Sequence, residues 1–190
     1  MMNELAGLAW LSVVLFLIHE FEEIILIKAW SVRHSEKIAT LWPKVKPFGL
    51  HLFDGNAYAA APITETASIG IGMQFALIAL LTLVSVLTGY YLVWIGFLAL
   101  MPLMSIFMHT RDAIRFKGYT PGVLTAVLTG IPTLYIVYRA LVLTDYGVWA
   151  VLISIVGVNL VFGFFAMRFM HRTATALSMR LQRYAQGKRG

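Results

Sequence analysis

The stretch His19-Glu20-Phe21-Glu22-Glu23 stands inside an apolar run, from Leu5 to Ala29, that otherwise has the composition of a membrane-spanning helix. An ionisable side chain at membrane depth costs roughly 2.5 to 3.5 kcal/mol on insertion scales. A helix carrying three carboxylates and an imidazole so close together therefore needs partner groups from elsewhere in the chain. Helical spacings of three and four place His19, Glu22 and Glu23 on one face, while Glu20 points elsewhere.

The composition is that of a membrane protein. Of the 190 residues, 59% are hydrophobic and 13% are charged, whereas about a quarter of the residues in a soluble domain are charged. The chain has no cysteine, which excludes disulfides, thiolate metal ligands and cysteine nucleophiles. The N-terminus lacks the basic segment and the small-residue cleavage site of a signal peptide, so we expect the first apolar run to be retained.

Five segments are long and apolar enough to cross a bilayer, for which about 20 residues are needed. They are residues 5–29, 64–87, 90–108, 121–143 and 146–170. The predicted fold class is all-α, a polytopic membrane protein whose five transmembrane helices form one helical-bundle domain over residues 1–190. Residues 31–62 are predicted to form an interfacial or re-entrant cytoplasmic segment, and residues 171–190 a basic cytoplasmic tail.

The basic residues predict an orientation. All but one of the 15 Lys and Arg residues lie in or beside the first loop, the third loop and the C-terminal tail, the exception being Arg139. The positive-inside rule then makes these segments cytoplasmic and puts the N-terminus outside. We expect a multi-pass protein of the cell inner (plasma) membrane, with membrane lipids as partners and a homodimer left open. The net charge of +6 follows from the same bias and needs no nucleic-acid partner.

Several ionisable groups fall in the cytoplasmic half of this bundle. At about 1.5 Å per residue, Glu22 and Glu23 lie roughly 8 Å below the cytoplasmic end of their helix. Glu65 opens the second predicted helix and His109 closes the third, at a similar level. Three of the five histidines also have a carboxylate three positions later, in the pairs His19 with Glu22, His51 with Asp54 and His109 with Asp112. On a helix, this spacing lets an imidazole and a carboxylate converge on one metal ion.

These groups predict a metal site. The proposed ligands are His19, Glu22, Glu23, Glu65 and His109. Imidazole and carboxylate without thiolate suit zinc, iron or manganese, as one ion or two. The charge of an ion would also offset the repulsion between the adjacent Glu22 and Glu23. Residues predicted to surround or cover the site are His51, Asp54, Asn56, Ser105, Asp112 and Tyr119.

Two further predictions concern the helices themselves. Thr120 and Pro121 suit the N-cap and the first position of the fourth helix. Asn159, a single amide in an apolar segment, is predicted to bond to a neighbouring helix rather than to bind a ligand.

The first motif, His109 in a later helix, and Tyr119-Thr120-Pro121-Gly122 shortly after it resemble the bacterial membrane family named for its HXXEE motif, whose function is unassigned. The resemblance extends from the first helix to the start of the fourth. Ser105 stands near the place where the family pattern often has an asparagine. The resemblance implies that the two motifs form one site, and it implies no reaction.

The favoured hypothesis is a membrane-embedded metal-dependent enzyme that acts on a lipid or other apolar substrate at the cytoplasmic leaflet. Glu23 would act as general base on a water activated by the metal. Hydrolysis or isomerisation is favoured over oxidation, because the multi-histidine boxes of membrane desaturases are absent. Two alternatives stay open, an ion- or proton-coupled carrier that uses the same carboxylates and a non-catalytic membrane scaffold.

Overall fold

The protein forms a bundle of helices. The computed structural model describes residues 2–42 and 62–187, and within them every regular element is helical. The long helices are α1 (Met2–Arg33), α3 (Pro62–Thr88), α4 (Leu92–Phe116) and α5 (Val123–Leu143). The last rod begins as α6 (Val148–Val161) and continues through the π-helical turn Phe162–Ala166 into α7 (Met167–Ala185). The all-α prediction is confirmed.

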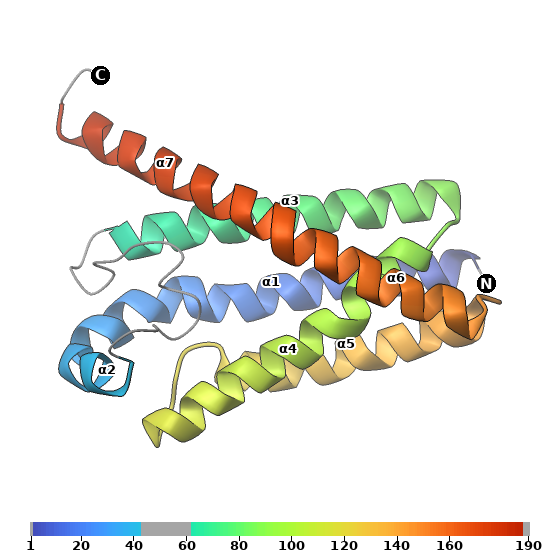
Figure 1. Ribbon diagram of the computed structural model, residues 1–190, viewed down its shortest axis with the longest axis horizontal. Coiled ribbons are helices and arrows are strands. Elements are labelled where there is room, and N and C mark those ends of the chain that lie inside the picture. The colour runs from blue at the N-terminus through green and yellow to red at the C-terminus, as the bar shows by residue number, and fades with distance from the viewer. Residues whose placement is uncertain (1, 43–61, 188–190) are drawn as a thin grey trace.

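Long rods that follow one another along the chain run in opposite directions, and the rods pack in a closed ring in which the neighbours α4 and the α6–α7 rod run the same way (Figure 1). Helix α1 packs between α3 and α5, α5 packs on α4, α4 on α6, and α7 returns to α3. The ends of α1, α4 and α7 and the starts of α3 and α5 therefore meet at one end of the bundle, beside the short helix α2 (Ser35–Leu41). The N-terminus lies at the opposite end.

Three helical segments are long and apolar enough to span a membrane: Ser68–Thr88, Leu92–Phe116 and Val123–Leu143. Helix α6 is also apolar but shorter. The length and apolar composition of these helices identify the chain as a membrane protein.

Helix α1 (Met2–Arg33) and the last rod (to Ala185) extend beyond the predicted segments 5–29 and 146–170. Two other helix ends that differ from the sequence-based expectation bear on the site. Helix α4 continues past residue 108 to Phe116, so His109 lies inside it. Helix α5 begins at Val123, so Thr120 and Pro121 precede the helix and the predicted N-cap is wrong. The physical reason is Gly122, whose φ of 84° is left-handed and cannot continue a right-handed helix.

Helix α6 is held against α4 by one close approach. A Cβ on Gly96 would stand 2.3 Å from the Ser154 Oγ, so only glycine allows this separation. The Asn159 Nδ2 donates to the Gly96 carbonyl at 2.9 Å, which confirms the prediction that Asn159 joins two helices. Backbones this close are typical of packing between membrane helices.

The buried face of α1 sets the position of the site. Toward the N-terminus this face is apolar and packs into the main hydrophobic core, with Ala9, Val13 and Phe16 among its members. Toward the other end, Trp30 packs with a second apolar cluster that includes Phe116 of α4. Between these two apolar stretches the same face carries His19, Glu20 and Glu23, so the polar groups are enclosed by helices on both sides.

Candidate metal centre

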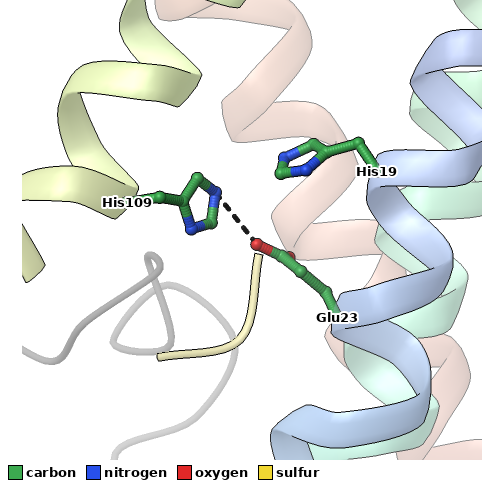
Figure 2. A group of neighbouring side chains, drawn as sticks. All are labelled: His19, Glu23 and His109. Atoms are coloured by element: carbon green, nitrogen blue, oxygen red, sulfur yellow. Dashed lines mark ion pairs between the residues drawn. The ribbon is translucent and has the colours of Figure 1, made fainter. Parts of the chain in front are cut away.

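Three side chains from two helices converge inside the bundle (Figure 2). His19 and Glu23 come from successive turns of α1, and His109 comes from the C-terminal third of α4. One donor atom of each lies within 4.8 Å of the others. The His109 Nε2 and the Glu23 Oε1 are 3.1 Å apart, and the two imidazole rings meet edge to face with centroids 4.9 Å apart. These three residues could hold a metal ion.

The α1 ligands are four residues apart, because one helical turn brings positions i and i+4 onto the same face. The predicted pairing at i+3 is not the one that converges. Ligand atoms in a tetrahedral zinc site with bonds of about 2.1 Å stand roughly 3.4 Å apart. The 3.1 Å between the His109 Nε2 and the Glu23 Oε1 is close to that separation, and all three donors lie within 4.8 Å of one another. Two histidines and one glutamate are also the protein ligands of a known class of catalytic zinc centre, which leaves a fourth position for water.

Both nitrogens of the His19 ring have hydroxyl partners. The Nδ1 atom lies 3.0 Å from the Thr125 Oγ1 on α5, and the Nε2 atom lies 3.0 Å from the Ser105 Oγ on α4. Since His19 is also buried, its ring is held in one orientation between three helices.

Glu22 lies beside the three-residue group and bonds to α5 and the loop before it. Its Oε2 accepts from the Thr125 main-chain N–H at 3.0 Å and from the Thr125 hydroxyl. Its Oε1 accepts from the Tyr119 hydroxyl. Partial burial and this carboxylate acceptor together raise the pKa of the Tyr119 phenol above its ordinary value. Glu22 is therefore occupied by hydrogen-bond donors on both oxygens.

The loop between α4 and α5 forms one wall of the site. The Trp30 Nε1 donates to the Tyr119 carbonyl at 3.0 Å, which ties the loop to α1. At Gly122, a Cβ would stand 2.4 Å from the His109 Cε1 and 2.8 Å from the Glu23 Oε1. The main chain of Gly122 thus covers the gap between these two side chains, and only glycine fits there.

The site holds more carboxylates than nearby basic side chains can pair. Glu20 is 8% exposed and lies near enough to Glu23 for the two carboxylates to interact electrostatically. Among the side chains that the structure describes, no Lys or Arg comes within salt-bridge distance of Glu20, Glu22 or Glu23. A buried carboxylate stays ionised only beside a paired charge or a metal and otherwise takes up a proton, and a divalent cation would allow these carboxylates to stay ionised.

The other predicted site residues are placed as follows. Asp112, one turn after His109, is buried and accepts from the adjacent Arg111 guanidinium at 2.8 Å. Glu65 belongs to the first turn of α3, and its side chain lies outside the described residues. His51, Asp54 and Asn56 also lie outside them.

Three residues with clear roles in this geometry, Gly122, Thr125 and Glu20, were absent from the predicted site. Gly122 belongs to the motif Tyr119-Thr120-Pro121-Gly122, whose residue types predict a helix start and not the wall of a site. Thr125 carried no signal, since a threonine in an apolar helix is common and usually bonds to its own helix. Glu20 was excluded by its helical angle, although its side chain is buried next to the site.

Comparison with known proteins agrees with the motif evidence. Neither a search of curated proteins nor a search of solved structures returned a match. The family model described as a protein of unknown function with HXXEE motif matches residues 10–137, which include the whole of the three-residue group and the loop that covers it. The chain therefore belongs to the HXXEE-motif family.

Proposed function

We propose that this protein is a membrane-embedded metal-dependent enzyme whose divalent ion is held by His19, Glu23 and His109. The observation that carries the proposal is the convergence of these three donors, with Glu20 buried beside them and no Lys or Arg among the described side chains to balance the charge. The ion is zinc, iron or manganese, by the chemistry of the donors. Glu65 stays a predicted further ligand, since α3 begins at the same end of the bundle.

The proposed topology has five spans, formed by α1, α3, α4, α5 and the α6–α7 rod, with the N-terminus outside and the C-terminus in the cytoplasm. The alternating helix directions support it, and so does the gathering of basic residues at the site end. The exception Arg139 donates to the Glu4 carboxylate at the other end of the bundle, which offsets its charge. The site then opens toward the cytoplasmic leaflet of the inner membrane.

The proposed reaction is a hydrolysis or isomerisation of a lipid or other apolar substrate. A divalent ion in such a site polarises a bound water or a substrate oxygen. Glu23 would hold the ion with one carboxylate oxygen and could take up a proton on the other. The apolar clusters on either side of the site along α1 would limit the access of bulk water, and an apolar substrate would approach from the bilayer.

Metal analysis tests the proposal. Protein purified without chelator should contain about one transition-metal ion per chain, and the Glu23→Gln and His109→Asn variants should lose it. Glu4→Gln is the matched control, because it removes an exposed carboxylate far from the site. Metal-dependent conversion of a component of a membrane lipid extract, followed by mass spectrometry, would then identify the substrate. A metal-free protein that carries ions in liposomes under a pH gradient would instead be a carrier. Absence of both metal and ion transport would favour the remaining hypothesis, a non-catalytic membrane scaffold.

A further inference from the structure

A continuous chain of hydrogen bonds runs through His19 and joins three helices. It begins at the Ser105 hydroxyl on α4, which lies 3.0 Å from the His19 Nε2. It continues from the His19 Nδ1 to the Thr125 Oγ1 on α5, again 3.0 Å away. It ends where the Thr125 hydroxyl meets the Glu22 Oε2, back on α1.

The direction of each bond follows from what Glu22 can do. An ionised carboxylate only accepts hydrogen bonds, and the neighbours of Glu22 are donors: the Tyr119 hydroxyl and the main-chain N–H and hydroxyl of Thr125. The single hydroxyl proton of Thr125 is therefore directed at Glu22. The His19 carbonyl, 3.4 Å from the same hydroxyl, is a more distant and uncharged acceptor.

The state of the His19 ring is then determined. Because the Thr125 proton points to Glu22, the Thr125 oxygen can only accept from His19, so the Nδ1 atom carries the hydrogen. A neutral imidazole has one N–H, which leaves the lone pair on Nε2. The Ser105 hydroxyl donates to that lone pair in the absence of metal.

Glu22 can hold this position because α5 begins beside it. The first N–H groups of a helix have no partner within the helix, and the positive end of the helix dipole favours a carboxylate there. The Thr125 N–H, in the first turn of α5, donates to Glu22 at 3.0 Å. Glu22 is thereby stabilised without a basic side chain and is engaged on both oxygens, unlike a carboxylate that is free to bind an ion.

We propose that Glu22 and Thr125 are positioning residues, which hold His19 in the Nδ1–H form and present its Nε2 atom as the metal ligand. Glu22 thus acts on the site through Thr125 and is not itself a ligand. The metal part of this inference rests on the proposed function, whereas the protonation of the ring does not. Ordering of a ligating histidine by a hydrogen bond from its other nitrogen is a known feature of metal centres, and losing it typically costs 10- to 100-fold in affinity.

Two variants test the role of the hydroxyl, one that matches threonine in shape and one that lacks its methyl group. Thr125→Val removes it, and Thr125→Ser keeps it. In protein labelled with 15N-histidine and freed of metal, the ring signals of His19, assigned by their loss in His19→Asn, should show Nδ1 protonated and Nε2 bare in the wild type and in Thr125→Ser. Thr125→Val should shift the ring to the other form or to a mixture. Its affinity for Zn²⁺ should fall by about 10- to 100-fold, with Thr125→Ser near the wild type.

Thr129→Val is the control for general effects of losing a buried hydroxyl on α5. The Thr129 hydroxyl donates to the Thr125 carbonyl within the helix and does not contact His19, so this variant should keep both the ring state and the affinity. A wild-type ring protonated on Nε2, or a Thr125→Val ring identical to the wild type, would overturn the inference. Wild-type protein that shows the expected ring states but binds no Zn²⁺ would instead overturn the proposed function and leave the positioning of His19 intact.

Discussion

Gly122 and His109 are in such close contact that the ring occupies the place where a side chain at 122 would begin. A Cβ on Gly122 would lie 2.4 Å from the His109 Cε1 and 2.6 Å from its Nδ1. The backbone there is also left-handed, with φ of 84°. The segment His19–Glu23 and the loop Tyr119–Gly122 therefore meet at the candidate site, the first supplying possible metal ligands and the second a main chain without a side chain.

Gly122→Ala should weaken metal binding. The added methyl group must displace His109 or Glu23, so we expect the affinity for Zn²⁺ to fall at least 10-fold, the lower range seen when an orienting contact is lost. Isothermal titration of purified protein in detergent would measure it. Gly89→Ala is the matched control, because Gly89 has a similar φ of 69° but nothing within 4 Å of its Cβ position. It should lose about 1 to 2 kcal/mol of stability and bind metal normally. Equal loss of affinity in both variants would contradict the steric argument.

Ser105→Ala should strengthen metal binding. The Ser105 hydroxyl and a metal ion compete for the same Nε2 lone pair of His19, and a neutral hydrogen bond is worth about 0.5 to 1.5 kcal/mol net. We expect a gain in Zn²⁺ affinity of up to about 10-fold. Ser154→Ala, which removes a hydroxyl bonded to the Leu92 carbonyl away from the site, should leave the affinity unchanged. A lower Zn²⁺ affinity in Ser105→Ala would mean that this hydroxyl stabilises the bound ion directly.

The sequence predicted the fold through simple physical signals. Apolar runs identified the long helices, and the charge cluster around His19 identified the helix face that needs partners. The wrong predictions concern single helix ends. The end of α4 was placed too early because Arg111 and Asp112 interrupt the apolar pattern, although a helix continues into polar residues wherever its backbone bonds are made. The start of α5 was placed too early because the left-handed φ of Gly122 is not visible in the sequence.

Charged groups in apolar helices also predicted part of the candidate site. His19, Glu23 and His109 were named because an imidazole or a carboxylate in an apolar helix is costly and therefore conspicuous. Which of Glu22 and Glu23 meets His109 could not be predicted. Adjacent residues on α1 point about 100° apart, and the packing of α5 decides between them. The role of Thr125 depends on a contact between helices far apart in the chain, which spacing within one helix cannot reveal.

Tyr119 should ionise only at unusually high pH. Burial and the Glu22 carboxylate raise the pKa of its phenol, so the folded state favours the neutral form. The stability that this contact confers is complete below about pH 10, the ordinary tyrosine pKa, and is lost as the pH rises through the higher value of the folded state. The difference in tyrosinate absorbance between wild type and Tyr119→Phe would report this single residue. In Glu22→Gln the midpoint should move down toward about 10. A midpoint near 10 in the wild type would show that the contact with Glu22 does not form.

Asn159→Leu should destabilise the bundle without affecting the site. It removes the bond from Asn159 to the Gly96 carbonyl, and hydrogen bonds between membrane helices average about 0.6 kcal/mol, up to roughly 1.7. Gly96→Ala should lose more, because the new Cβ would stand 2.8 Å from the Ser154 main-chain carbon, which cannot rotate away as a side chain can. Unfolding in mixed detergent micelles would rank the two variants, and Zn²⁺ binding should stay at the wild-type level in Asn159→Leu. If Gly96→Ala were as stable as the wild type, α4 and α6 could not lie as close as they do here.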